Sequence, residues 1–143
     1  YYNFVSPEVY NYIIPGHGLV MIFFFLMPVL IGGFGNYLLP LLLGLGDLNL
    51  PRPNALSAWL LLPSAVCLGI SMVNGAGVGW TYYTSLSSVG CTVVGADLLM
   101  FALHLAGVSS ILGSATFFGT IYSCMEGLVV LRFSIDVWAY LFT

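Results

Sequence analysis

Lysine is absent from this sequence of 143 residues, and arginine occurs twice, at Arg52 and Arg132. Together with five acidic residues, the arginines bring the charged fraction to 5%, where a soluble domain has about 25%. A chain this poor in charge could not cover a surface in water. Its net charge of −3 also excludes the basic footprint of a nucleic-acid-binding protein, so we expect no nucleic acid partner.

Cysteine is scarce too, with three residues that lie far apart and show no metal-binding spacing: Cys67, Cys91 and Cys124. We interpret all three as small apolar packing residues. The first residues lack a positively charged stretch followed by an apolar core. The sequence therefore predicts neither a signal peptide nor a transit peptide.

Apolar residues are abundant, and they make up 60% of the chain in long continuous runs. Continuous runs favour membrane helices over a transmembrane barrel, in which apolar and polar residues alternate. The run over residues 17–40 has no formal charge. At about 1.5 Å rise per residue it is long enough to cross a hydrocarbon core of about 30 Å. The sequence therefore predicts an all-α membrane protein.

We expect residues 1–143 to form a single membrane segment within a larger helical bundle. Three transmembrane helices and the start of a fourth are expected at about 13–43, 55–73, 97–121 and 133–143. The stretch over 74–88 is rich in glycine, serine and aromatic residues, which is typical of a folded interfacial loop. Trp80 is expected at the level of the lipid headgroups.

The two arginines predict an orientation in the membrane. Arg52 follows the first span and Arg132 follows the third, so two crossings place them on the same side. By the positive-inside rule this is the cytoplasmic or matrix side. The N-terminus and the Trp80 loop are then expected on the opposite, positive side.

Four blocks of sequence carry a family resemblance. Residues 17–40 (HGLVMIFFFLMPVLIGGFGNYLLP) resemble the second transmembrane helix of subunit I of the haem–copper oxidase family. Residues 47–54 (DLNLPRPN) resemble the link after that helix, and residues 77–82 (GVGWTY) are similar to the loop after the third. Residues 103–113 (LHLAGVSSILG) resemble the fourth helix. The blocks follow the family's order, and by this resemblance the chain spans helices two, three and four and enters helix five.

This resemblance implies part of the catalytic subunit of a respiratory terminal oxidase, which reduces O₂ to water and couples this to proton pumping. The family's copper ligands and its other haem ligands lie in helices that the matched blocks do not include. The resemblance therefore implies a haem, of the a type, bound to this segment, with copper bound elsewhere in the complex.

The resemblance also implies partners and a location. The partners are the remaining segments of the same subunit, other oxidase subunits, the lipid bilayer, and cytochrome c as electron donor. A quinol oxidase shares these motifs, so the sequence leaves quinol open as the donor. The implied location is the mitochondrial inner membrane or a bacterial plasma membrane.

His17 is the main candidate residue. A histidine at the mouth of an apolar helix is either an interfacial anchor or a functional group, and its position alone does not separate the two. Gly16 and Gly18 flank it, and small flanking residues leave room for a flat macrocycle to approach the imidazole. A neutral imidazole is a common axial ligand of haem iron. The resemblance makes His17 the ligand of the low-spin haem.

Asp47 is the second candidate. A carboxylate in a polar link is commonly solvated, and Arg52 could form a weak surface pair with it. The same membrane face also gathers three carboxamides, on Asn36, Asn49 and Asn54, and such groups can order waters. The resemblance makes Asp47 the entrance of the proton pathway from the negative side, with Asn36 and Asn54 just inside it.

Serines in membrane helices usually bond to their own helix and serve packing. The resemblance instead places three serines along the same file of waters: Ser57, Ser109 and Ser110. Thr116 stands where the family commonly has another pathway asparagine, and a hydroxyl offers fewer donors than an amide. The sequence leaves both interpretations of the serines open.

Two further ionisable residues receive no catalytic role. His104 lies in the middle of the third span, and we expect a hydrogen-bonded structural histidine there. Glu8 belongs to the stretch SPEVY, which echoes a different family motif, HPEVY, that carries a copper ligand. Because Ser6 stands in place of that histidine, we interpret Glu8 as an interfacial residue.

Two other functions compete with the oxidase hypothesis. One is a haem-free transporter or channel subunit in which Asp47 and Asn36 form the conduction mouth. The other is a structural membrane subunit that packs against a catalytic core. A visible absorption spectrum of the purified complex separates the oxidase from both.

Overall fold

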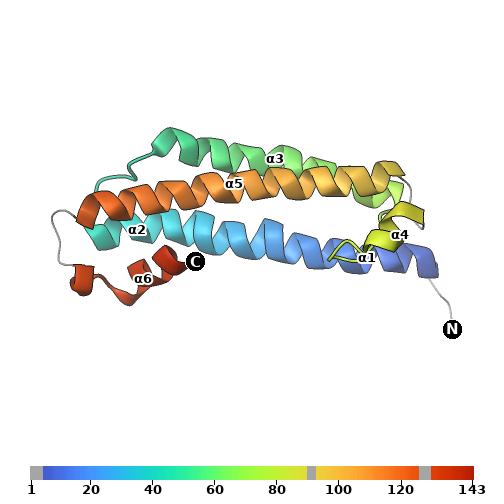
Figure 1. The fold of residues 1–143 in the computed structure, drawn as a ribbon, viewed down its shortest axis with the longest axis horizontal. Helices are drawn as coiled ribbons and strands as arrows, with labels where there is room; N and C mark the ends of the chain where they lie inside the picture. Colours follow the sequence, from blue (N-terminus) through green and yellow to red (C-terminus); the bar gives the residue numbers. More distant parts are fainter. Residues whose placement is uncertain (1–4, 90–92, 126–129) are drawn as a thin grey trace. The chain divides into compact units, whose positions relative to one another are not determined.

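The computed structural model describes residues 5–89, 93–125 and 130–143, and helices make up most of this part of the chain, which contains no strand (Figure 1). Three helical stretches are long and apolar enough to cross a membrane: Pro7–Leu43, Pro51–Asn74 and Val94–Met125. A shorter helix follows at the C-terminal end, α6 (Ile135–Phe142). The prediction of an all-α protein with three spanning helices is confirmed.

The first spanning stretch begins with α1 (Pro7–Leu19), six residues before the expected start at 13. Ser6 caps the helix, because its hydroxyl accepts a hydrogen bond from the Val9 N–H at 3.4 Å. Pro7 stands in the first turn, where a missing N–H costs nothing, and the Glu8 carboxylate lies near the positive end of the helix dipole.

The middle of this stretch is wound as π-helix, in η1 (Val20–Leu26) and η2 (Pro28–Gly35). Pro28 has no N–H to donate to the carbonyl four residues earlier, so the α-helical ladder lacks one hydrogen bond at this point. The α-helix resumes in α2 (Asn36–Leu43). It stops at Gly44, which has a φ of 69°, and the Leu45 N–H bonds back to the Pro40 carbonyl at 2.8 Å.

The remaining elements extend beyond the ranges expected from apolar content. α3 (Pro51–Asn74) begins four residues before the expected position 55, and α5 (Val93–Met125) runs past the expected 97–121 at both ends. Between them lies the expected loop, which includes a short helix, α4 (Thr84–Val89). A 3-10 turn, η3 (Val130–Arg132), precedes α6.

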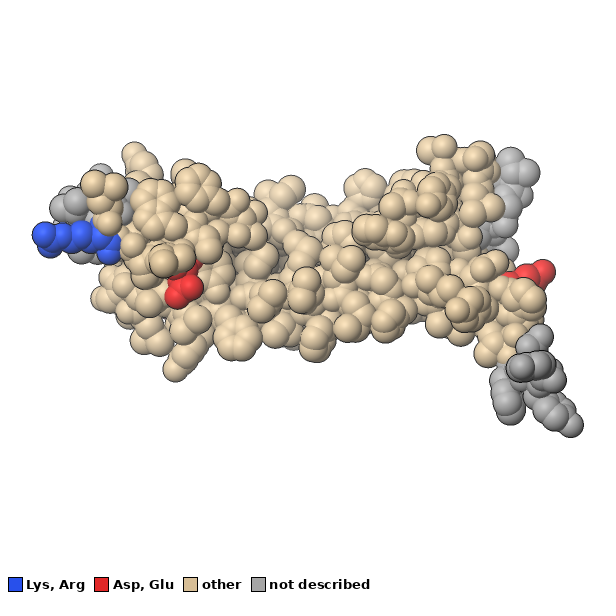
Figure 2. Space-filling view, turned by 90° about the horizontal axis from the view of Figure 1, so that it is seen from below, with Lys and Arg blue, Asp and Glu red and all other residues tan. Residues whose placement is uncertain are grey.

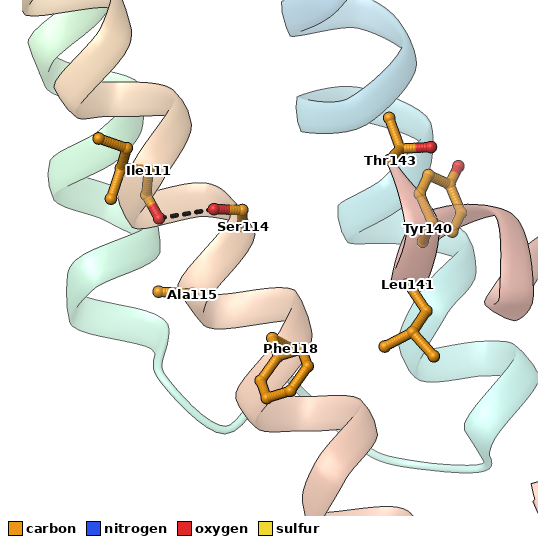
Figure 3. A pocket seen from close by; sticks show the side chains of 7 residues that line it. All are labelled: Ile111, Ser114, Ala115, Phe118, Tyr140, Leu141 and Thr143. Atoms are coloured by element: carbon orange, nitrogen blue, oxygen red, sulfur yellow. Dashed lines mark hydrogen bonds between the residues drawn. The ribbon is translucent and has the colours of Figure 1, made fainter.

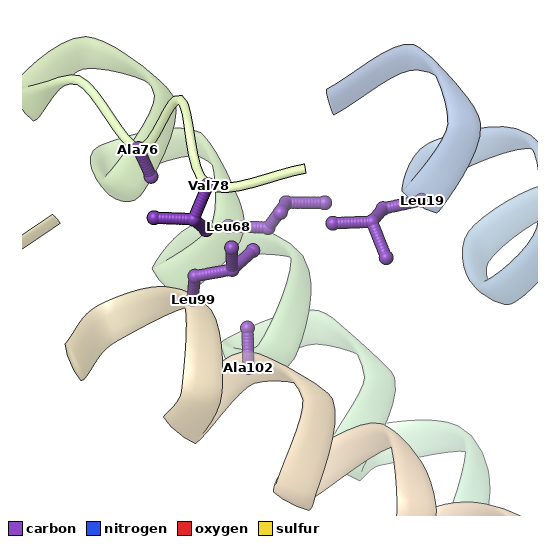
Figure 4. Close-up of a cluster of buried hydrophobic side chains, with 6 residues drawn as sticks. All are labelled: Leu19, Leu68, Ala76, Val78, Leu99 and Ala102. Carbon is purple, nitrogen blue, oxygen red and sulfur yellow. The ribbon is translucent and has the colours of Figure 1, made fainter. Parts of the chain in front are cut away.

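The described residues cluster into two compact units, and α3 and α5 contribute residues to both. The first unit contains the residues up to Phe25 and Leu61–Ala106. Figure 4 shows its core, in which α1, α3, the following loop and α5 bring together six buried apolar residues: Leu19, Leu68, Ala76, Val78, Leu99 and Ala102. The half-buried Cys67 packs against this cluster, as its interpretation as a packing residue predicts.

The second unit contains Leu26–Leu60 and Gly107–Thr143. Its core joins α2, the following link, α5 and α6 through six buried apolar residues: Leu39, Leu43, Leu48, Phe117, Ile121 and Val137. The half-buried Cys124 packs against this cluster, whereas Cys91 lies outside the described residues. Gly35 is also buried here, and it packs so closely against Phe117 that a Cβ at this position would overlap the Phe117 ring.

Serines connect α3 to α5 at regular intervals. Within the first unit, the buried Ser64 hydroxyl donates to the Ala102 carbonyl and the buried Ser71 hydroxyl donates to the Gly95 carbonyl, each at 2.5 Å. Within the second unit, Ser109 donates to the Ser57 carbonyl at 2.6 Å. Successive partners are seven residues apart on both helices, 57, 64 and 71 against 109, 102 and 95. Seven residues are about two helical turns, so each helix presents one face to the other.

Most apolar side chains of the spanning stretches point outward. In their most apolar windows 11%, 17% and 22% of the residues are buried, in chain order. The face drawn in Figure 2 is accordingly almost entirely uncharged. Because so much apolar surface is uncovered, the described helices require lipid or further helices around them.

Candidate functional site

His17 lies in the last turn of α1, and its side chain is exposed. Within the described part of the chain, no hydrogen bond engages its ring. His104 is also exposed, but its Nδ1 lies 2.7 Å from the Met100 carbonyl oxygen, one turn earlier on α5. This is the hydrogen bond expected for a structural histidine. The described residues leave both ring nitrogens of His17 unengaged, whereas they leave only Nε2 of His104 unengaged.

The two glycines beside His17 serve packing between elements of the first unit. Gly16 is buried, and a Cβ on it would overlap the sulfur of Met72 on α3. A Cβ on Gly18 would lie 3.9 Å from the Cβ of Trp80. The absence of side chains here therefore lets α3 and the Trp80 loop approach α1. The sequence interpretation had assigned this space to a macrocycle alone.

The Trp80 loop is held against α1 and α5 by both apolar and polar contacts. Val78 and Ala76 are buried beside Leu19, and the Tyr82 hydroxyl donates to the Ala96 carbonyl at 3.0 Å. The Trp80 side chain itself is exposed, as expected of an interfacial residue.

Asp47 lies in the link between α2 and α3, within the second unit, and its side chain is exposed. One carboxylate oxygen, Oδ1, accepts a hydrogen bond from the Leu48 N–H at 2.7 Å. No ion pair joins Asp47 to Arg52 among the residues that the structure describes. The carboxylate is therefore open to water and is not neutralised by that arginine.

The two asparagines expected near Asp47 are both half-buried. Asn36 begins α2, and its Oδ1 is buried without a hydrogen-bond partner among the described residues. A buried acceptor without a partner is costly, which points to a donor from outside this part of the chain, such as water. Asn54 lies in the first turn of α3. Neither asparagine is hydrogen-bonded to Asp47 in the described ranges.

Of the three expected serines, the structure brings two together. Ser57 and Ser109 face each other with their hydroxyl oxygens 3.4 Å apart, and Ser109 uses its proton on the Ser57 carbonyl. Ser110, the next residue of α5, is exposed. Thr116 is buried and donates to the Leu112 carbonyl of its own helix at 2.8 Å. The Ser109 hydroxyl proton is thus used in a contact between the two helices, whereas the Ser57 hydroxyl oxygen can still accept a hydrogen bond.

A polar cluster near Asp47 was not fully anticipated. Asn49 contacts Thr120 and Ser123 near the end of α5, although these residues lie more than seventy positions away along the chain. The available signal was the spacing of Thr116, Thr120 and Ser123, which places three hydroxyls on one face of an otherwise apolar helix.

A cavity of about 340 Å³ also lies in the second unit, between α5 and α6. Figure 3 shows its lining, which is largely apolar and includes the Ser114 hydroxyl bonded to the Ile111 carbonyl of its own helix. The lining contains no acid, histidine or cysteine, so we assign no chemistry to this cavity. Across the described ranges, no group of three or more histidine, cysteine or acidic residues could hold a metal ion.

Comparison with known proteins gives a consistent result. The model of the family described as cytochrome c and quinol oxidase polypeptide I matches residues 1–143. Cytochrome c oxidase subunit 1 of Candida albicans is 41% identical over 142 residues, and that of Yarrowia lipolytica is 42% identical over the same length. Each match covers 96% of this chain but 27% and 26% of the relative, so the chain spans about a quarter of the length of these relatives.

Proposed function

This chain belongs to the cytochrome c and quinol oxidase polypeptide I family, and from this premise we propose that it forms part of the catalytic subunit of a respiratory terminal oxidase. Such a subunit reduces O₂ to water with electrons from cytochrome c and couples this reaction to proton pumping. The family match over the full length of the chain carries the proposal. Three apolar helices of spanning length support it.

His17 is the residue that would hold the low-spin haem. Its side chain fits this role, because the ring is exposed at the end of α1 and the described residues leave both nitrogens unengaged. A haem of the a type bound there would supply a one-electron redox centre. The protein would present the imidazole from the last turn of α1, where Gly16 and Gly18 let α3 and the Trp80 loop pack beside it. Copper would be bound by other segments of the complex.

Asp47 is the residue that would take up protons. Its carboxylate is exposed to water, and no ion pair joins it to an arginine in the described part of the chain. Asn36 and Asn54 would orient the first waters, and the unpartnered Oδ1 of Asn36 supports this role. Ser57, Ser109 and Ser110 would continue the file, with Ser57 and Ser109 also fixing α3 against α5.

The partners and location follow from the same premise. The remaining segments of the subunit, other oxidase subunits and lipid would cover the exposed apolar faces of the helices. The location would be the mitochondrial inner membrane, as a multi-pass protein with its N-terminus on the intermembrane-space side. Arg52 and Arg132 on the opposite side support this orientation.

Substitution of His17 tests the proposal in the assembled oxidase. His17→Leu removes the imidazole and keeps an apolar side chain, so the visible absorption band of the low-spin haem should disappear. His104→Leu is the matched control, because it removes an imidazole that is bonded to its own helix. That variant should keep the low-spin band.

An unchanged low-spin spectrum in assembled His17→Leu oxidase would contradict the ligand assignment. A wild-type complex without any haem band would contradict the oxidase proposal itself and favour the haem-free channel or structural subunit.

A further inference from the structure

The link between α2 and α3 is held in the second unit at two successive residues. Leu48 is 5% exposed and packs into the core with Leu39 and Ile121. Asn49 is turned toward α5, where it makes hydrogen bonds through its backbone and its side chain. Asp47 precedes both, and its Oδ1 is bonded to the Leu48 N–H. The position of the carboxylate thus depends on the two residues that follow it.

The bonds of Asn49 converge on one turn of α5. Its backbone N–H donates to the Thr120 hydroxyl at 3.2 Å, and its side-chain Nδ2 donates to the Gly119 carbonyl at 3.5 Å and to the Ser123 hydroxyl. Leu50 completes the contact, since its Cδ1 lies 3.7 Å from the position that a Cβ on Gly119 would take.

The acceptors on α5 are themselves fixed. Thr120 is fully buried, and its hydroxyl donates to the Thr116 carbonyl at 2.7 Å. The Ser123 hydroxyl donates to the Thr120 carbonyl at 3.0 Å. Each hydroxyl therefore donates its hydrogen bond to a carbonyl of its own helix and presents its oxygen to Asn49 in one orientation. Such an arrangement holds a link more firmly than contacts to mobile side chains would.

We propose that Asn49, bound to Thr120 and Ser123, is a positioning residue that fixes the Asp47 carboxylate at the mouth of the proton pathway. This inference rests on the proposed function, because it assigns the contact a purpose only if Asp47 takes up protons. Asn49 then lies outside the file of waters, and it affects proton uptake by fixing the position of the Asp47 carboxylate. The sequence had grouped Asn49 with the carboxamides that order water.

The contact can be broken from either partner in the assembled oxidase. Thr120→Val keeps the shape of the buried side chain and removes the oxygen that accepts from Asn49. Asn49→Ala removes the two side-chain bonds and keeps the backbone N–H. Thr120→Ser restores the hydroxyl and serves as the conservative rescue. Ser114→Ala is the matched control, because it removes a hydroxyl of α5 that is bonded within the same helix.

Two measurements decide the proposal. Hydrogen exchange of the backbone amides over residues 44–50 should speed up by about three- to tenfold in Thr120→Val and Asn49→Ala, as expected for the loss of one or two hydrogen bonds. Proton uptake should slow by a similar factor in both, and Thr120→Ser and Ser114→Ala should behave as wild type. In an Asp47→Asn background, Thr120→Val should slow uptake no further, because an effect exerted through Asp47 disappears with it.

Unchanged exchange, unchanged uptake, or an equal slowing by Thr120→Val with and without the Asp47 carboxylate would each overturn the positioning role. Normal uptake in the single variant Asp47→Asn would remove the proposed pathway and the positioning role with it. Slowed uptake in Asp47→Asn together with normal uptake in Thr120→Val would overturn the positioning role and leave the pathway intact.

Discussion

Hydrogen bonding distinguishes polar residues whose roles the sequence alone does not tell apart. His104 is bonded to its own helix, while the ring of His17 is not engaged by any described residue. Ser109 uses its proton across to α3, whereas Asn36 buries an oxygen that no described donor reaches. The His17 ring and the Asn36 oxygen are therefore open to a ligand or to water, as is the exposed Asp47 carboxylate.

If Asp47 is the proton entrance that we propose, Asp47→Asn should slow proton uptake and turnover of the assembled complex. The substitution keeps the shape of the side chain and removes the group that titrates. The fall should be about tenfold or more, since a positioned proton-transfer group typically contributes at least that much. If His17 holds a low-spin haem as proposed, the spectrum of that haem should stay normal, because the substitution leaves the imidazole in place. Proton uptake and oxygen consumption measured on the same preparation test this expectation.

Asp136→Asn is the matched control, because Asp136 is an exposed aspartate in the first turn of α6 with no assigned role in uptake. It should keep normal turnover. If Asp47→Asn behaved in the same way, Asp47 would be an ordinary solvated link residue. A surface pair with Arg52 would in any case be worth less than about 1 kcal/mol.

The sequence was sufficient to select His17 and Asp47, because an ionisable group beside a long apolar run stands out without any knowledge of its neighbours. It could not assign Asn49, because that assignment depends on Thr120 and Ser123, which only the folded chain brings near. For the same reason it left the serines undecided. Whether a hydroxyl faces a carbonyl of another helix depends on how α3 and α5 pack, and local patterns do not contain that information.

The serine contacts between α3 and α5 predict a measurable contribution to stability. Ser64→Ala removes a buried hydrogen bond to the Ala102 carbonyl and should lower the free energy of unfolding by about 0.5 to 1 kcal/mol. Ser71→Ala should cost a similar amount. The two effects should nearly add, because the residues lie two turns apart, or about 10 Å. Thermal denaturation of the purified complex measures this.

The control is again Ser114→Ala, whose hydroxyl bonds to the Ile111 carbonyl within α5. An equal loss of stability in this control would show that the hydrogen bonds between the helices carry no special weight. Haem content and proton uptake should be unchanged in Ser64→Ala and Ser71→Ala, which lie outside the proposed haem and proton sites.

The ends of the helices show a second reason why sequence interpretation was incomplete. Apolar content predicted the middle of each span but placed the start of the first at 13 and that of the second at 55. The structure starts α1 at Pro7 and α3 at Pro51, because proline suits the first turn of a helix and Ser6 caps α1. These capping residues are polar or lack an N–H, so a search for hydrophobic runs passes over them.

The uncovered apolar surface of the described helices predicts obligatory association. Lipid tails can cover apolar faces, but they offer no hydrogen-bond partner to the exposed Ser110 of α5 or to the ring of His17. Residues 1–143 expressed by themselves should therefore fail to form a stable monomer with bound haem. Size-exclusion chromatography in mild detergent, followed by a visible absorption spectrum, tests this. Recovery of the chain as a stable monomer with bound haem would contradict this expectation.

The seven-residue repeat of the serine contacts also limits how the gene can change in length. One residue inserted into α3 between Ser57 and Ser71 would turn every later side chain by about 100° and move Ser71 away from Gly95. A compensating insertion in α5 would have to fall between Gly95 and Ser109. Insertions and deletions among relatives are therefore expected outside residues 57–71 and 95–109. An alignment of related sequences should show no gaps within these two stretches.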